Sequence, residues 1–267
     1  NVNANTACSI ASDNFVHDNA NNGVEIREGA LGVSGTWHRV SAGNCPFIIT
    51  RRPWFSAPTA LTIEPGVTVK FRTGAWLEVA GPMTAQGTDA NRIAFTSIKD
   101  DSFGGDTNGD SSATSPAGAD WKEVTVYGSG GASQFAYCVF RYAGNASYQD
   151  WGGFWHTSHG NVYLNGVAPS LDHCEFSFSG QDGVANAGAD VTYQSCTFAN
   201  NPRLGLFTFG DSDVTLNSCI SAGNPEATQS NGEEGGSIVA NYCDLVGINY
   251  WRKLVLNQYD QWVWAWT

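Results

Sequence analysis

The chain has 267 residues, of which only 14% are charged, and it holds 31 glycines and 10 tryptophans. Its formal net charge of −12 gives a surface that repels nucleic-acid phosphates, and no apolar run approaches the ~20 residues of a membrane-spanning helix. The composition therefore argues against a nucleic-acid-binding protein and a membrane span, and it favours many short strands separated by turns.

Residues 1–57 are expected to form an N-terminal cap and a first irregular segment of the same domain. The segment begins NVNANTACS, without an initiator methionine or the basic and apolar regions of a signal peptide. This is typical of a mature chain after export, although a chain cut at a boundary would look the same. Cys8 and Cys45 stand apart from the other cysteines, and a disulfide between them would pin this segment in an exported protein.

The regular part of the fold is expected from residue 58 to residue 250. Its first runs are LTIEPGVTVKF, AWLEVAGPMTAQG and NRIAFTS, between residues 61 and 97. They alternate apolar and polar residues or are rich in β-branched ones, and Pro-Gly, Gly-Pro and Gly-Thr separate them. We interpret these runs as strands joined by tight turns.

An acidic loop follows these strands and is a candidate calcium site. Asp106, Asn108 and Asp110 occupy alternate positions of DTNGD, as oxygen ligands do in the first half of an EF-hand loop. Ala117 stands where an EF-hand would have its glutamate, so ligands would have to come from outside the motif. The alternative is a solvated acidic loop whose Gly and Asn residues only form turns. The candidate calcium ligands are Asp100, Asp101, Asp106, Asn108, Asp110 and Asp120.

An aromatic insertion, NASYQDWGGFWHTSHGN, is the candidate ligand-binding surface. Exposed aromatic rings stack on sugar faces, and carboxylates or imidazoles hydrogen-bond to hydroxyls. The alternative is a loop that packs its own rings against the wall of the fold. A zinc site would need a third ligand beside the two histidines. The residues expected to contact a ligand are Tyr148, Asp150, Trp151, Trp155, His156 and His159.

Five cysteines mark a repeat in the second half of the chain. After one longer first step they recur at intervals of 22 to 24 residues, at positions 138, 174, 196, 219 and 243. Each lies in a short β-prone run that Gly or Asn closes, which is the pattern of a β-solenoid. One cysteine in each coil makes a column, so we expect a stack of reduced thiols in the core.

The runs LTIEPGVTVKF, LEVAGPMTAQGT, IAFTSIKDDSFGGDTNGD and ADW resemble those of bacterial secreted or cell-surface proteins with right-handed parallel β-helix repeats. The resemblance covers about residues 58 to 248, and the DTNGD insertion is its most specific part. It implies an all-β chain folded as a single-stranded right-handed parallel β-helix with capped ends, and a secreted or cell-surface location. It implies almost nothing about activity.

The last residues, 251–267, are expected to form a Trp-rich cap or docking strand. Trp262, Trp264 and Trp266 share one face of an extended strand. They would either seal the last coil or dock onto a neighbouring copy, a cell-wall polymer or a sugar.

Taken together, these features predict a calcium-stabilised binding or structural module that engages a polysaccharide, a cell-surface glycan or its own copies. The alternative is a polysaccharide lyase or glycoside hydrolase on the same scaffold. Its bases would come from Lys122, Arg141 and Arg203, and its acids from Asp172, Asp182, Asp190 and Asp211. Most of these acids lie in turn contexts, where Asp is expected for backbone hydrogen bonding alone.

Overall fold

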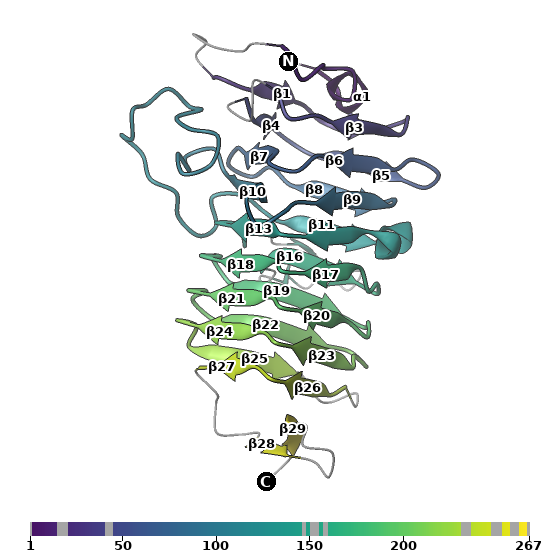
Figure 1. Ribbon diagram of the computed structural model, residues 1–267, viewed down its shortest axis with the longest axis vertical. Helices are drawn as coiled ribbons and strands as arrows, with labels where there is room; N and C mark the ends of the chain where they lie inside the picture. The colour runs from purple at the N-terminus through teal and green to yellow at the C-terminus, as the bar shows by residue number, and fades with distance from the viewer. Residues whose placement is uncertain are drawn as a thin grey trace.

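The computed structural model describes nine parts of the chain, residues 2–14, 21–40, 45–145, 148–149, 155–156, 160–230, 236–246, 253–256 and 262–265. The described strands wind into a parallel β-solenoid of about eight turns, with the two ends of the chain at opposite ends of the stack (Figure 1). Helix is confined, in these parts, to α1 (Ala4–Ala7) and the short 3-10 helix η2 (Gly128–Ala132). The expected β-solenoid is therefore confirmed.

Each turn contributes one strand to each of three sheets, named here A, B and C. Sheet A contains β1 (Val24–Ile26), β4 (Phe47–Ile49), β7 (Thr68–Phe71), β10 (Ile93–Ser97), β13 (Cys138–Arg141), β18 (Glu175–Ser177), β21 (Thr197–Ala199), β24 (Ile220–Ala222) and β27 (Asp244–Leu245). Sheet B contains β2 (Gly29–Ala30), β5 (Pro53–Ser56), β8 (Leu77–Ala80), β11 (Val124–Tyr127), β16 (Gly160–Asn165), β19 (Asp182–Ala187), β22 (Leu204–Phe209) and β25 (Glu226–Ser230).

Sheet C contains β3 (Gly35–Trp37), β6 (Leu61–Ile63), β9 (Met83–Gln86), β12 (Gln134–Ala136), β17 (Ser170–Asp172), β20 (Thr192–Gln194), β23 (Val214–Asn217) and β26 (Ile238–Asn241), and then β29 (Trp262–Ala265) and β28 (Lys253–Leu256). The turns from sheet C to sheet A form the C–A corner, and those from sheet A to sheet B form the A–B corner. A hairpin of β14 (Tyr148–Gln149) and β15 (Trp155–His156) lies outside the three sheets.

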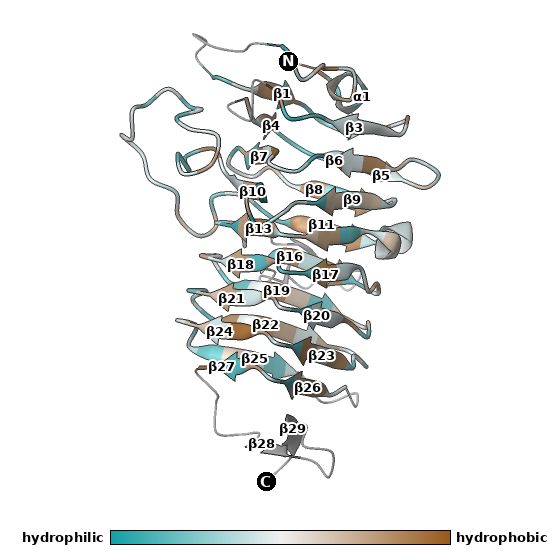
Figure 2. Cartoon of the chain, in the orientation of Figure 1, coloured by the Kyte–Doolittle hydropathy of each residue, from teal (hydrophilic) through white to brown (hydrophobic). Residues whose placement is uncertain are grey.

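Parallel register stacks like side chains inside the solenoid. Phe95, Phe140, Phe176 and Phe198 pair in register on four successive strands of sheet A. Their ring centroids are 4.7, 5.3 and 5.4 Å apart, close to the ~4.8 Å that separates neighbouring strands. The rings belong to one hydrophobic core that runs the length of the molecule, and Figure 2 shows hydrophobic residues on strands of all three sheets.

The five repeated cysteines form the expected column of thiols at the C–A corner. Each thiol lies close to a carbonyl oxygen of sheet C one coil earlier, as in Cys174 to Phe135 at 3.5 Å and Cys219 to Tyr193 at 3.4 Å. Burial raises the pKa of Cys138 and Cys196 well above that of a free thiol, so these groups stay protonated and act as small apolar core residues.

A left-handed residue precedes every one of these cysteines. The φ angles of this residue lie between 50° and 54° in Tyr137, His173, Ser195, Ser218 and Tyr242. This conformation is costly for a residue with a side chain. In the first four of these residues, the N–H donates to a carbonyl of the next coil, so a coil-to-coil hydrogen bond offsets the strain. In these five coils the C–A corner is thus a one-residue turn before the cysteine, whereas the same corner is longer between β6 and β7 and between β9 and β10.

Coils begin earlier than the sequence suggested. β1 pairs in parallel with β4, and β4 pairs with β7, so residues 24–63 already form two turns of the solenoid. The expected start at residue 58 was wrong because the early strands are short and lack the repeated cysteine. The cap is confined to the first residues, where Val2 bridges to Ile26 and Ala7 of α1 is buried.

The disulfide expected between Cys8 and Cys45 is not formed, and both residues carry thiols. Cys8 lies directly against Gly35 of sheet C, whereas Cys45 precedes β4 of sheet A and contacts Val24. The two side chains therefore pack against different walls. Burial raises the pKa of Cys8 and raises that of Cys45 to about 11.

At the other end, the C-terminal hairpin extends sheet C. β29 pairs antiparallel with β26, so that Trp262 lies opposite Ala240, and β28 pairs with the far edge of β29 (Figure 1). This pairing covers the edge strand β26 of sheet C. Trp266 lies outside the described residues. No helix among the described residues is long and apolar enough to cross a bilayer.

The phenylalanine stack generates a first prediction. Replacement Phe176→Ala should lower the free energy of unfolding by about 3–5 kcal/mol, because it leaves a cavity between two stacked rings. Urea denaturation measures the loss. Ile220→Ala is the control on the same sheet, since Ile220 is 47% exposed and should cost about 0.5 kcal/mol or less. Equal losses for the two variants would contradict the proposed core.

Candidate functional site

The acidic loop leaves the solenoid at the A–B corner, between β10 and β11, and projects sideways from the stack (Figure 1). Two aspartates fasten its ends to β10. Asp100 accepts a hydrogen bond from the Thr96 hydroxyl at 2.6 Å, and Asp120 accepts one from the Ser97 hydroxyl at 2.7 Å. Asp120 also pairs with Lys99 at 2.7 Å. Both carboxylates therefore close the base of the loop.

Asp106 organises the tip of the loop. Its Oδ1 accepts hydrogen bonds from the N–H groups of Gly109, at 2.8 Å, and Asp110, at 3.1 Å. Its Oδ2 accepts a third from the N–H of Ser111 at 2.8 Å. One carboxylate thus satisfies three successive backbone donors, which folds DTNGDS into a compact turn.

Asp110 completes the tip. It accepts hydrogen bonds from the backbone N–H groups of Ala113 and Thr114, from the Thr114 hydroxyl and from the side-chain amide of Asn108. These bonds lower the pKa of Asp110, with the Thr114 hydroxyl as the largest cause. The carboxylate is therefore charged across the neutral range.

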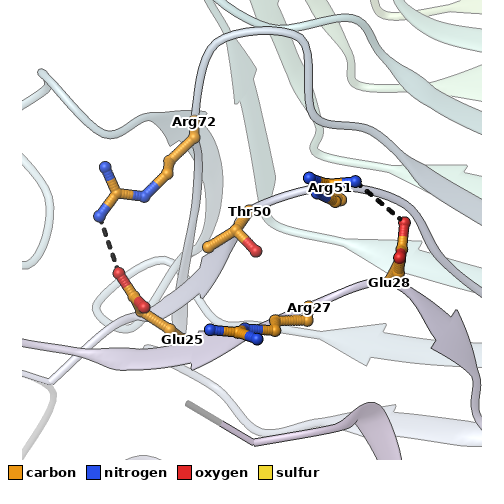
Figure 3. A pocket seen from close by; sticks show the side chains of 6 residues that line it. All are labelled: Glu25, Arg27, Glu28, Thr50, Arg51 and Arg72. Atoms are coloured by element: carbon orange, nitrogen blue, oxygen red, sulfur yellow. Dashed lines mark hydrogen bonds and ion pairs between the residues drawn. The ribbon is translucent and has the colours of Figure 1, made fainter.

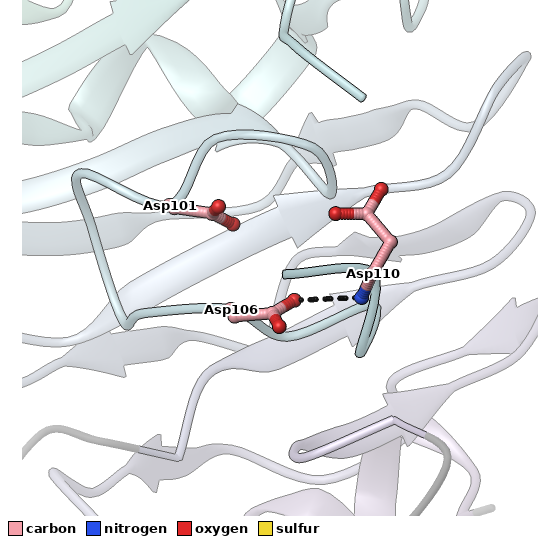
Figure 4. Close-up of side chains that lie close together, drawn as sticks. All are labelled: Asp101, Asp106 and Asp110. Atoms are coloured by element: carbon pink, nitrogen blue, oxygen red, sulfur yellow. Dashed lines mark hydrogen bonds between the residues drawn. The ribbon is translucent and has the colours of Figure 1, made fainter. Parts of the chain in front are cut away.

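Three carboxylates of the loop meet at one point. Asp101, Asp106 and Asp110 each offer an oxygen, and these oxygens lie within 4.8 Å of one another (Figure 4). Two oxygens of this loop, Asp101 Oδ1 and Asn108 Oδ1, are buried and have no hydrogen-bond partner in the structure. Carboxylate and amide oxygens without a donor are the ligands that calcium prefers, so the residues present fit a hard cation.

The structure therefore divides the six predicted ligands. It brings together Asp101, Asp106 and Asp110, with Asn108 in the same turn, whereas Asp100 and Asp120 hold the base of the loop by other hydrogen bonds.

A buried lysine beneath the loop was missed by the sequence analysis. Lys70 of β7 is fully buried, and its ammonium donates to the carbonyl of Gly105 at 2.7 Å. Burial lowers its pKa to about 8, although Asp100, Asp101 and Asp106 oppose this effect. Side chains alternate along a strand, so a lysine between inward-facing Val69 and Phe71 should face solvent. Lys70 is buried only because the acidic loop folds over it.

The predicted ligand-binding insertion leaves the A–B corner one coil later, between β13 and β16. Its hairpin pairs Tyr148 with His156 and Gln149 with Trp155. The other predicted contact residues, Asp150, Trp151 and His159, lie outside the described residues.

An aromatic groove lies at the same corner and was not predicted. It encloses about 590 Å³, and the rings of Tyr142 and Phe178 stack in its wall with centroids 5.6 Å apart. Phe178 remains 39% exposed. In the next coil the equivalent residue is Asn200, so no third ring continues the stack. The recurrence of an aromatic residue four positions after Cys138 and Cys174 could have indicated this groove.

Six of the seven residues considered for an enzyme are engaged with other groups. Arg203 pairs with the fully buried Asp182, Asp172 pairs with His173 at 2.7 Å, and Asp190 accepts a backbone hydrogen bond. The other two candidate bases are also occupied: Lys122 lies over the ring of Trp76, and Arg141 pairs with Glu175.

Comparison of the chain with protein-family models, with curated proteins and with solved structures gave no match in any of the three.

The loop geometry generates a second prediction. Replacement Asp106→Ala should speed amide exchange of Gly109, Asp110 and Ser111 about tenfold or more in the presence of EDTA, because these N–H groups lose their acceptor. Asp101→Asn should leave the same exchange rates nearly unchanged, since Asp101 accepts no backbone bond from these residues. Hydrogen-exchange NMR measures both. Equal exchange in the two variants would show that Asp106 does not hold the turn.

Proposed function

We propose that this protein is a secreted or cell-surface module of bacterial type, in which a β-solenoid stabilised by calcium presents a carbohydrate-binding face. The single observation that carries the calcium part is the group of buried oxygens without donors beside three converging carboxylates.

The negative charge of the three carboxylates supports a bound cation. Three converging carboxylates repel one another, and the ammonium of Lys70 below the loop is hydrogen-bonded to the carbonyl of Gly105. A divalent ion would neutralise the remaining charge and supply the missing partner of Asp101 Oδ1. Because the loop is fastened to β10 at both ends, binding at its tip would stabilise the adjoining coils.

Two aromatic features at the A–B corner support carbohydrate binding. The groove wall carries the partly exposed ring of Phe178, and the insertion with the predicted contact residues begins a few residues after Tyr142. Rings of this kind stack on the apolar faces of sugars, while neighbouring amides bind hydroxyls. A polysaccharide or cell-surface glycan is therefore the proposed partner. Self-association through the C-terminal strand stays a prediction, since β29 pairs within its own chain.

Calcium should raise the melting temperature by about 5–10 °C at a concentration a hundred times the dissociation constant, and EDTA should reverse the effect. Asp101→Asn should abolish most of this shift, because it replaces a carboxylate whose Oδ1 has no donor. Asp244→Asn, which removes the same charge from exposed β27, is the control and should keep the full shift. Identical melting curves with calcium and with EDTA would refute the calcium site.

A glycan array probed with and without calcium should identify a retained sugar. Phe178→Asn should weaken retention about tenfold through loss of the ring, while the backbone is preserved because Asn200 has the same left-handed conformation one coil later. Tyr242→Asn is the matched control, since Tyr242 is also left-handed and 94% exposed but lies outside the groove. New reducing ends or unsaturated products would instead favour the lyase or hydrolase.

A further inference from the structure

A second cavity, far from the acidic loop along the chain, lies at the A–B corner of the first three coils. It encloses about 530 Å³, and its lining consists of Glu25, Arg27, Glu28, Thr50, Arg51 and Arg72 (Figure 3). None of these residues was singled out by the sequence. The cavity exists because the solenoid brings three separate turns of the chain into one vertical row.

The register of the coils stacks the basic residues. The N–H of Thr50 bonds to Ile26 O, and the N–H of Arg72 bonds to Ile49 O. Arg27, Thr50 and Arg72 each directly follow the last residue of their sheet A strand and are therefore equivalent positions of successive coils. Figure 3 shows the side chains of Arg27, Arg51 and Arg72 arranged around Thr50.

Glutamates hold two of the three arginines. Arg72 pairs with Glu25 at 2.7 Å, in partly buried surroundings, and this contact fixes its guanidinium at the edge of the cavity. Arg51 lies 3.5 Å from Glu28, but both side chains are mostly exposed, so the pair is weak.

Arg27 differs from the other two arginines. No hydrogen bond or ion pair joins its guanidinium to another residue of the described chain. Its N–H groups therefore remain available beside the hydroxyl of Thr50, which itself donates to Ile26 O at 3.1 Å. A guanidinium presents a planar fork of donors that matches the two oxygens of a carboxylate or sulfate.

The charge of the cavity contrasts with that of the molecule. Three arginines face two glutamates here, whereas the whole chain carries 13 basic and 25 acidic residues. Long-range attraction would therefore not concentrate a polyanion on this protein. Recognition has to come from short-range bidentate contacts, which suits a ligand with one isolated anionic group. The cavity volume lies within the range typical of small-molecule sites.

We propose that this cavity binds a small ligand through one oxyanion, a carboxylate or a sulfate, with Arg27 as the principal contact and Arg51 and Arg72 beside it. The site shares no residue with the acidic loop or the aromatic groove, so it stands independently of calcium and of the function proposed above.

Isothermal titration of the full chain in EDTA and 0.15 M salt tests this proposal. The probes are glucuronate, glucose 6-sulfate, inorganic sulfate and glucose. Glucuronate or glucose 6-sulfate should bind measurably, and glucose should bind at least tenfold more weakly. Tight binding of inorganic sulfate as well would identify the oxyanion alone as the recognised group. EDTA removes any calcium that could bridge an anion to the acidic loop.

Two variants locate the binding. Arg27→Gln should weaken binding of the anionic probes at least tenfold without loss of folding, because Arg27 is exposed and its side chain is not part of the core. Arg52→Gln is the control. It removes the same charge from the residue that follows Arg51, which pairs with Glu78 outside the cavity, and it should change the affinity less than twofold. Equal losses in the two variants, equal binding of glucose and glucuronate, or no binding of any probe would overturn the proposal.

Discussion

Parallel backbone hydrogen bonds join each coil of the solenoid to the next, and the core of this protein depends on that pairing. Within its own sheet, a residue in a strand pairs with its counterparts one rung above and one rung below, about 4.8 Å away. Side chains of like shape then stack without voids, as Phe140 and Phe176 do with rings nearly parallel at 7°. The cysteines form a column for the same reason, because they occupy equivalent positions of successive coils and therefore lie one above another.

The three corners of a coil do not tolerate change equally. In the coils with a repeated cysteine, a single left-handed residue turns the chain at the C–A corner, and the cysteine that follows packs in or against the core. The A–B corner is different, because the chain there faces outward and can lengthen without disturbing the core. Buried asparagines help to hold it, as Asn201 does by donating to Phe176 O and accepting from the N–H of Ser179.

All of the candidate sites consequently lie along the A–B corner. The arginine-lined cavity occupies it in the first three coils, the acidic loop leaves it after β10, and the aromatic insertion leaves it after β13. The groove beside Phe178 follows it further down the stack. One face of the solenoid therefore carries charged, acidic and aromatic surfaces one after another along the stack.

The sequence by itself determined the strand content, the coil length and the position of the thiol column, because a constant rung forces equivalent residues to recur at a nearly constant interval. It also identified Asp106, Asn108 and Asp110, since a tight turn depends on neighbours in the chain. Only the tertiary structure decided which more distant groups join them. Lys70 lies 35 residues from its partner Gly105. Arg27 and Arg72 occupy equivalent positions two coils apart, and no repeated cysteine marks the register there. Cys8 and Cys45 were misjudged for the same reason: spacing along the chain does not specify against which wall a side chain packs.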